Sequence, residues 1–462
     1  MYTFCIRRSC VRWALYLFLP SSSLFAQQHY SLQQLIDAAG RNLPVIKQKQ
    51  LLADAAKAGV TDVKHSFLPQ VKLSDQLNMA TDNSIAGTYL PLGTTLSSSA
   101  GVRASNNSSP ATGNFGVLYG EYELVNFGLN AARLKNAEAY VVLQQADLEK
   151  ERYLLQLAVA REYFSLLKTK YRLEADKQNV NRYDSIFKVI RVLAASGIKA
   201  GADSSLSKAE LSGARIAYNQ TVGNLNQVKV RLAYLTGIPV PTLNVDSLAD
   251  FTSRQVPVLR FAADTVGNPL IDYYAKKNNL LITEQAVIRK SYAPKILLAG
   301  GGWMRGSSIQ YNDDYKSLTT GLGYQRFNYA AGIAFTYNLF NGLYKKDKLN
   351  ISHLQVLAGG YELQQQQLSL LLAADQADNT LQTNEANLIE LPVRLQSAED
   401  TYRQKLAQYK AGIISLIDLT NASFVLYRSQ TDYIQAISDW YLARLDKAAA
   451  IGNLTRFTQT IK

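Results

Sequence analysis

Few side chains in this sequence are placed to do chemistry. The three histidines, His29, His65 and His353, lie far apart, and none belongs to a paired spacing typical of a metal site. Cys5 and Cys10 both precede a short apolar run near the N-terminus. No Ser-His-Asp order and no pair of acids indicates a catalytic cleft. We therefore expect a protein that is not an enzyme, with no catalytic residues, no cofactor and no metal.

The first residues have the order of a secretory signal. Arg7, Arg8 and Arg12 come before an apolar run that ends at Leu19, and a Ser-rich stretch follows as far as Ala26. This order predicts a cleaved signal peptide over residues 1–26, which would also remove both cysteines. Its loss lowers the formal net charge from +13 to +10. The remaining basic residues are scattered, so we expect no nucleic-acid partner.

Two acidic residues occupy equivalent places in a duplicated sequence. Asp203 follows a Gly-Ile pair by a fixed spacing, and Asp418 does the same 215 residues later. Other segments repeat in register, which chance matches would not do, so the chain consists of two homologous halves. The repeated segments are Gly197-Ile198 and Gly412-Ile413, and Tyr122 to Asn126 and Tyr337 to Asn341, at an offset of 215, and Ser66 to Pro69 and Ser291 to Pro294 at 225.

Each half carries the same elements in the same order: a helix, two strands, a very long helix and a shorter returning helix. We expect the first repeat over 27–240, with a β-hairpin at 67–125, a long helix at 129–196 and a return helix at 203–236. A linker without periodicity covers 241–265. The second repeat covers 266–452, with a hairpin at 294–340, a long helix at 343–411 and a return helix at 418–450. Residues 453–462 are expected to form a flexible tail.

The strands have one apolar and one polar or small face. From Tyr329 to Leu339 every second residue is apolar or aromatic, whereas the residues between them, from Asn328 to Asn338, are small or polar. A barrel wall with lipid outside and water inside requires this pattern. A soluble sandwich would also show it. Four strands cannot close a barrel around water, so the barrel interpretation needs several copies of the chain.

The long helices carry a coiled-coil seam. Apolar residues stand seven apart from Leu134 to Leu155 and again from Leu349 to Leu370. A helix of this length extends roughly 100 Å at 1.5 Å per residue, far beyond an ordinary globular domain. Pro392 predicts a bend or local unwinding in the second long helix. No later segment is apolar for long enough to predict a membrane-spanning helix.

Taken in this order, the elements resemble the TolC-like family of outer-membrane efflux proteins over about residues 30 to 455. The marks of the resemblance are the proline at each first strand, the turns with a glycine and a later aspartate, the 215-residue duplication, and the strand ends Asn126-Phe127-Gly128 and Phe340-Asn341-Gly342. The resemblance implies an α+β membrane protein. Three chains would build a twelve-stranded β-barrel in outer-membrane lipid and an α-helical tunnel across the periplasm of a Gram-negative-type cell.

The resemblance also implies partners and a gate. The homotrimer would dock a periplasmic adaptor protein and an inner-membrane transporter, and the helical tips around Gly197, Ile198, Gly412 and Ile413 would meet the adaptor. Asp418 matches a ring of acids at the periplasmic entrance, and Asn421 stands where the family has a second acid.

Tyr409 and Asp203 match a pair that ties neighbouring helices shut in this family. A second tie needs a basic residue where this chain has Ile414. Independently of the family, Asp203 and Asp418 could act only as caps of the returning helices.

Two other functions fit parts of the sequence. A periplasmic adaptor has a long helical hairpin, but it would carry one hairpin and compact β domains. A coiled-coil fibre would have the heptads without the turn glycines and aspartates. The sequence names neither the transported substrate nor the pump.

Overall fold

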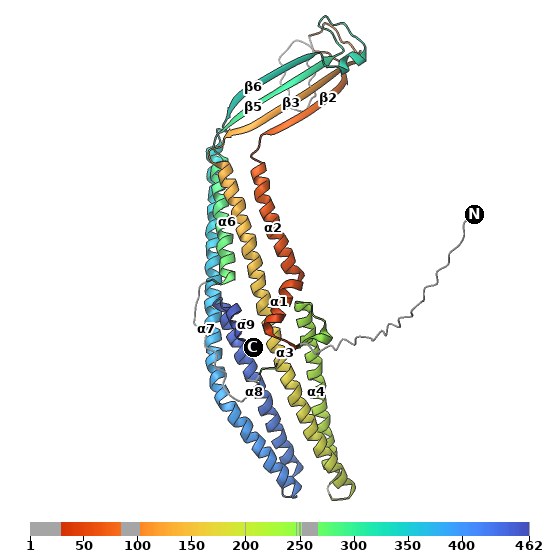
Figure 1. The fold of residues 1–462 in the computed structure, drawn as a ribbon, viewed down its shortest axis with the longest axis vertical. Coiled ribbons are helices and arrows are strands. Elements are labelled where there is room, and N and C mark those ends of the chain that lie inside the picture. The colour runs from red at the N-terminus through yellow and green to blue at the C-terminus, as the bar shows by residue number, and fades with distance from the viewer. Residues whose placement is uncertain are drawn as a thin grey trace, which may run out of the picture.

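The protein is a long rod of helices with a sheet at one end (Figure 1). The computed structural model describes residues 29–84, 102–198, 200–245, 247–248, 251 and 267–461. The expected signal peptide with Cys5 and Cys10, much of the expected linker and the middle of the first hairpin loop lie outside the described residues. No helix in the described ranges combines the length and apolar character needed to cross a membrane.

Four antiparallel strands form the sheet in the order β2-β3-β5-β6. The central pairing of β3 with β5 joins the two halves of the chain, while β2 and β6 lie at the edges. A short helix in the second hairpin loop, η2 (Leu318–Leu322), packs against β3 and β5. The strands are β2 (Gln70–Ala80), β3 (Ala111–Val125), β5 (Lys295–Ser307) and β6 (Arg326–Thr336).

The pairing register separates the side chains into two faces. Phe335 pairs with Ile296 and Ile333 pairs with Leu298, so the apolar residues of neighbouring strands share one face. Most of these side chains have no cover within the chain, since Tyr329 is 82% exposed and Leu73 is 82% exposed. A soluble sandwich would bury this face, so the soluble alternative does not fit.

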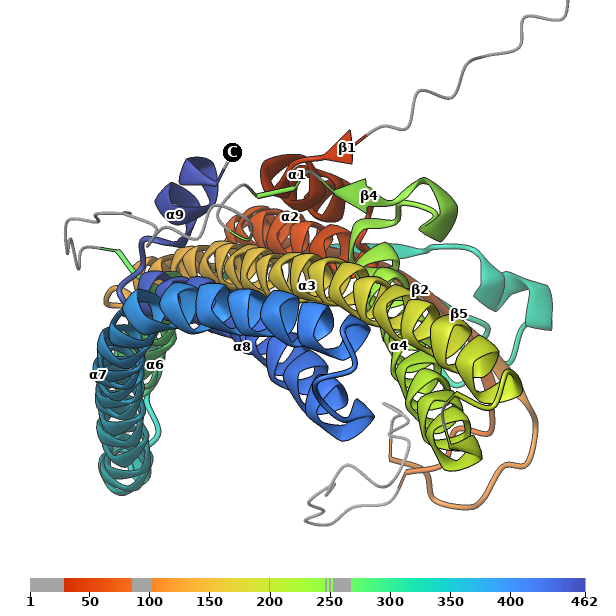
Figure 2. The same cartoon turned by 90° about the horizontal axis from the view of Figure 1, so that it is seen from below.

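Two shorter helices lie end to end along each long one. In the first half, α2 (Pro44–His65) and α4 (Gly201–Thr236) pack against α3 (Leu129–Ala195). In the second, α6 (Pro269–Ser291) and α8 (Leu416–Ala450) pack against α7 (Asn341–Lys410). Contacts of α3 with α6 and α8 unite the halves, and the helices form one curved layer (Figure 2).

Short elements fill the gap between the ends of α2 and α4. They are β1 (His29–Tyr30), α1 (Leu32–Asn42), the 3-10 helix η1 (Val240–Thr242) and β4 (Asn244–Val245), with β1 and β4 paired in parallel. Helix α9 (Leu454–Thr460) lies on the same side of the layer (Figure 2). The Asn42 side chain donates a hydrogen bond to the Thr236 carbonyl at 2.8 Å, which ties α1 to the end of α4.

The expectation of a flexible C-terminal tail is wrong. Residues 454–460 form α9, and Leu454 and Phe457 are completely buried. Phe457 lies 6.2 Å from Phe164 of α3, measured between ring centroids. Phe164 in turn stacks on Tyr441 of α8 at 5.0 Å. The tail sequence is polar on average, but Leu454 and Phe457 are spaced for one helix face, and their burial stabilises the end of the chain.

The local unwinding expected at Pro392 does not occur. Helix α7 is continuous through this residue and curves along its length (Figure 1). Leu388 and Leu395, one turn before and one turn after the proline, are 1% and 5% exposed. Packing on both sides therefore holds the helix across a residue that cannot donate its backbone hydrogen bond.

Candidate functional site

The far end of the rod from the sheet consists of two matching helical turns. Gly197 and Gly412 have φ angles of 74° and 76°, in the left-handed region where a side chain would be strained. The N–H of Ile198 donates to Leu193 O at 2.9 Å, and the N–H of Ile413 donates to Gln408 O at 2.9 Å. This pattern ends both long helices in a Schellman motif. Ile198 and Ile413 then project into solvent, 69% and 72% exposed.

Each returning helix begins differently. Ser415 is the N-cap of α8, and its backbone N–H and hydroxyl donate to the Asp418 carboxylate at 3.1 and 2.6 Å. These two hydrogen bonds from Ser415 hold the pKa of Asp418 below its usual range, with the hydroxyl contributing more. Asp418 and Asn421 are both exposed. Asp418 is thus a charged, solvent-facing group in the first turn of α8.

Neither aspartate occupies the N-cap position that the capping interpretation requires. The N-cap of α4 is Ala200, which offers no side-chain bond, and Asp203 lies inside the first turn. Asp418 is the third helical residue and completes the capping box of Ser415. A carboxylate in the first turn still interacts favourably with the helix dipole. Asp418 therefore stabilises α8 through both the capping box and the helix dipole. Asp203 stabilises α4 through the helix dipole and takes part in no capping box.

Tyr409 of α7 and Asp203 of α4 belong to the two different hairpins of one chain. Burial raises the pKa of the Tyr409 phenol, and the negative charge of Asp203 raises it further. Tyr409 belongs to a small apolar cluster that closes the end of the rod. The buried members of this cluster come from α3, α4, α7 and α8: Tyr183, Ile186, Ile190, Leu211, Ala214, Tyr409, Leu416 and Leu419.

Above this cluster lies a buried polar network that joins three helices. Asp176 of α3 is 1% exposed. Its carboxylate accepts hydrogen bonds from Thr221 of α4 at 2.6 Å and from Tyr427 of α8 at 2.5 Å. Arg172 lies one turn away on α3, with its Nε 3.2 Å from the same carboxylate, and donates to the Tyr427 hydroxyl at 2.9 Å. The two hairpins are therefore connected by satisfied, partly charged hydrogen bonds.

Sequence reasoning missed this network, although a signal was present. Apart from the half-buried Glu162, the seven-residue series that runs through Leu148 and Leu155 continues to Thr169 and Asp176. Those four residues are all buried. An acid at a seam position must find hydrogen-bond donors or be destabilising. Extending the series to Asp176 would therefore have predicted a buried carboxylate with hydrogen-bond donors around it.

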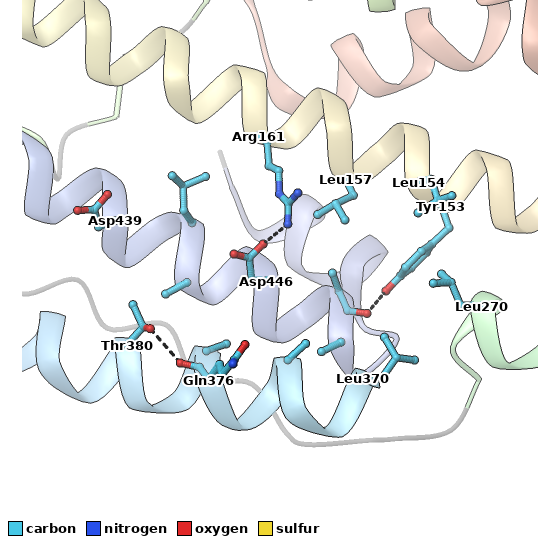
Figure 3. A pocket seen from close by; sticks show the side chains of 16 residues that line it. Tyr153, Leu154, Leu157, Arg161, Leu270, Leu370, Gln376, Thr380, Asp439 and Asp446 are labelled. Atoms are coloured by element: carbon cyan, nitrogen blue, oxygen red, sulfur yellow. Dashed lines mark hydrogen bonds and ion pairs between the residues drawn. The ribbon is translucent and has the colours of Figure 1, made fainter. Parts of the chain in front are cut away.

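A groove lies halfway along the rod, between α3, α7 and α8 (Figure 3). Its volume is about 520 Å³. Arg161 forms an ion pair with Asp446 at 2.7 Å, and the Tyr153 hydroxyl donates to the Ala449 carbonyl at 2.6 Å. These polar groups bind one another, and leucines line much of the rest. Within the described ranges, no cluster of His, Cys, Asp or Glu could hold a metal ion.

A curved layer of coiled-coil helices below an uncovered amphipathic sheet is the architecture of an outer-membrane channel subunit. The family model of the outer membrane efflux protein matches residues 35–238 and 287–453. The chain belongs to this family, and it is an outer-membrane channel that works in efflux and extends into the periplasm. The predicted fold class is confirmed. A comparison with curated proteins found no match.

Solved structures of outer-membrane channels share the fold. The CmeC channel of Campylobacter jejuni is 16% identical, with a TM-score of 0.74 over 93% of this chain and 90% of that chain. The VceC protein of Vibrio cholerae is 14% identical, with a TM-score of 0.73 over 91% and 96%. The open state of the MtrE channel of Neisseria gonorrhoeae is 18% identical, with a TM-score of 0.68 over 93% and 90%.

The polar network makes a testable contribution to stability. Replacing Asp176 with Ala leaves the Thr221 and Tyr427 hydroxyls and the Arg172 guanidinium without their shared acceptor. We expect a loss of about 3 kcal/mol in the free energy of unfolding, measured from the helical circular dichroism signal in urea. The matched control is Asp184→Ala on the same helix, which removes exposed ion pairs to Lys188 and Arg215 and should cost less than about 1 kcal/mol. Equal losses in the two variants would contradict this role.

Proposed function

We propose that three copies of this chain form a closed channel, with a twelve-stranded barrel in the outer membrane and a helical tunnel in the periplasm. The observation that carries the proposal is the pair of sheet edges, β2 and β6, which are fully exposed along their lengths. An open sheet edge in lipid leaves backbone N–H and C=O groups without hydrogen bonds, at a cost of several kcal/mol each. Pairing β6 of one copy with β2 of the next removes every edge.

The strand lengths and faces support a membrane barrel. The strands have between 11 and 15 residues, enough to cross the hydrocarbon core when tilted. The face with Tyr329, Ile333 and Phe335 would contact lipid, and the face with Asn328 and Ala330 would line the lumen. Neither a periplasmic adaptor nor a coiled-coil fibre requires a sheet with an exposed apolar face, so both alternatives are disfavoured.

The helices support a conduit that continues the lumen. Helix α3 has 67 residues and α7 has 70, each roughly 100 Å long. The side of α7 that carries Ile351, Leu354 and Tyr361 leaves these apolar side chains at least half exposed. A neighbouring copy would bury them. We further propose that transport through this tunnel is passive and that the chain is not an enzyme, which its membership in a family of efflux channels supports.

The tips would be both the gate and the docking end. Asp418 and Asn421 would line the entrance, and the Tyr409 and Asp203 pair would hold the two hairpins of each chain together. The exposed turns Gly197-Ile198 and Gly412-Ile413 offer the apolar contacts that a periplasmic adaptor needs. An inner-membrane transporter would deliver substrate through that adaptor.

The proposal predicts the number of chains in the assembly. We expect the protein from outer-membrane fractions to run in detergent as a particle of three chains, because a single chain leaves two edges open. Native mass spectrometry and chemical cross-linking measure this directly. A stable monomer recovered from the outer membrane would refute the proposal.

Two neighbouring residues of β6 provide a control for the orientation of the sheet. Ile333→Arg places a charge on the proposed lipid face, which costs about 2–4 kcal/mol near the middle of a bilayer, and should strongly reduce trimer in the membrane fraction. Ala334→Arg places the same charge on the lumenal face and should leave the trimer yield close to that of the wild type. The reverse result would mean that the faces are assigned wrongly.

Asp418 is predicted to dominate the charge of the entrance. Three copies place three carboxylates around a narrow opening, which attracts cations and repels anions. Asp418→Asn should lower cation preference, seen as a shift in reversal potential, and weaken block by divalent cations added on the periplasmic side. Asp400→Asn, on the exposed surface of α7, is the matched control. Unchanged selectivity in Asp418→Asn would remove this residue from the constriction.

The Tyr409 and Asp203 pair is predicted to restrain opening. Tyr409→Phe removes only the hydroxyl and should raise the mean conductance of single trimers in bilayers. A bond of this kind is worth about 1.5–3 kcal/mol when one partner is charged. Asp203→Asn should act in the same direction, and the double variant should add little, because both changes break one contact. Additive effects, or wild-type conductance in both single variants, would exclude the lock.

A further inference from the structure

Two arginines stand directly opposite each other at the loop end of the sheet. Arg305 is near the end of β5, Arg326 begins β6, and the two are register partners. Paired strands lie about 4.8 Å apart, and like charges directly opposite each other in a sheet are destabilising. Strand pairing alone therefore gives no reason for this arrangement. The Arg326 guanidinium donates to the neutral Gln325 carbonyl at 3.0 Å, which leaves its charge in place, so a bound anion would lower the repulsion between the two strands.

Both arginines belong to the face that would line the lumen. Arg326 is two residues before Asn328 and alternates with Phe327 and Tyr329, which point to the lipid face. Arg305 pairs with Phe115 of β3 as well as with Arg326. In the proposed trimer, three such arginine pairs surround the channel near its extracellular exit, on the side of the barrel far from the helices (Figure 1).

Aromatic side chains share this part of the lumenal face. Phe115 is 36% exposed, and the Arg305 guanidinium lies over its ring at 5.7 Å from the centroid. Trp303, two residues before Arg305, pairs with Val117 and Asn328 on the same face. A water-lined wall needs polar or small side chains, so the lumenal requirement does not explain these rings. Rings beside guanidinium groups suit a flat ligand that carries a negative charge.

The acids on the lumenal face of the described strands lie at the opposite end. They are Glu121 and Glu123 of β3, and Glu123 forms an ion pair with Lys295 at 2.6 Å. Glu121 pairs with Ala299, six residues before Arg305 on β5, which is roughly 20 Å along a strand. The exit half of the wall is therefore basic and the half toward the helices is not.

We infer that Arg305 and Arg326, with Phe115 and Trp303, form a binding site for aromatic anions, meaning ring compounds that carry a carboxylate or a sulfonate, on their way out of the channel. The inference rests on the proposed trimeric channel. The guanidinium groups bind the anion, and the Trp303 and Phe115 rings contact the ring of the substrate. Because Asp418 at the tips and the arginines at the exit have opposite signs, an anion that passes the tips moves to lower electrostatic energy as it approaches the exit.

The test uses 1-naphthalenesulfonate added on the extracellular side of single wild-type trimers in a planar bilayer. We expect block of the current that depends on concentration. The double variant Arg305→Gln and Arg326→Gln should weaken the apparent affinity about tenfold or more, since one charge-assisted hydrogen bond corresponds to at least that factor. The same variant should shift the reversal potential toward cation preference. The double variant Arg305→Lys and Arg326→Lys keeps both positive charges, so its reversal potential should stay close to that of the wild type. Its block by 1-naphthalenesulfonate should still weaken, because lysine lacks the planar guanidinium group.

Two comparisons separate the parts of the site. Methanesulfonate carries the same charged group without a ring and should block the wild type more weakly than 1-naphthalenesulfonate does. Trp303→Ala should weaken block by 1-naphthalenesulfonate and leave block by methanesulfonate unchanged. Lys316→Gln removes a cation of the outer loop, paired with Asp314 at 2.5 Å, and should behave as the wild type. Equal block of the wild type and the Arg-to-Gln variant, with normal conductance in both, would overturn the inference. A wild-type protein that forms no conducting trimer would instead overturn the proposed channel.

Discussion

The backbone hydrogen bonds of the two edge strands are the constraint on which the rest of the structure depends. Every internal pairing of the sheet is antiparallel and nearly regular, with a single irregularity where β3 meets β5 near Glu123. The edges β2 and β6 are complete strands of 11 residues, without the prolines, bulges or short lengths that proteins use to protect an edge. Such edges are tolerable only when another strand covers them.

The helices follow from the same requirement. Each half of the chain supplies one hairpin and one long helix, and the central β3–β5 pairing fixes the halves side by side at the top of the rod. Helices α3 and α7 continue from β3 and β6, which lie on either side of β5, and the shorter helices fill the space beside them. The end-to-end placement of α2 with α4, and of α6 with α8, puts a shorter helix beside each long helix along most of the rod without requiring another long helix.

Sequence patterns predicted this architecture because they repeat. The offset of 215 residues located equivalent strands and turns, and the period of two in β6 separated the same faces that the register separates. Features that depend on contacts between distant elements were not predictable in the same way. The helix around Phe457 forms because α3 and α8 offer an aromatic surface, and α7 continues through Pro392 because Leu388 and Leu395 are held in the core.

In the candidate site, too, local features were predictable from the sequence and contacts between distant elements were not. The turn glycines and the position of Asp418 were visible in the sequence, since local hydrogen bonds determine a Schellman motif and a capping box. The cap itself, Ser415, was not predicted, although the Ser-x-x-Asp order of a capping box stands at residues 415–418. The Asp176 network depends on Thr221 and Tyr427, which lie 45 and 251 residues away, so no local pattern could supply its donors.

The distribution of buried groups also determines where the rod can rearrange at least cost. Toward the sheet from Asp176, the halves share a large aromatic and aliphatic core that includes Phe164, Trp440 and Tyr441. Toward the tips from Asp176, the described contacts between the halves include the small cluster around Ile190 and Tyr409 and the contacts of Arg182 with Gln430 and Tyr402. Separating the hairpins below the network breaks these few contacts, whereas separation above it must also break the hydrogen bonds to a buried carboxylate. Movement of the tips is therefore the least costly rearrangement of the described helices, and the Asp176 network marks its upper limit.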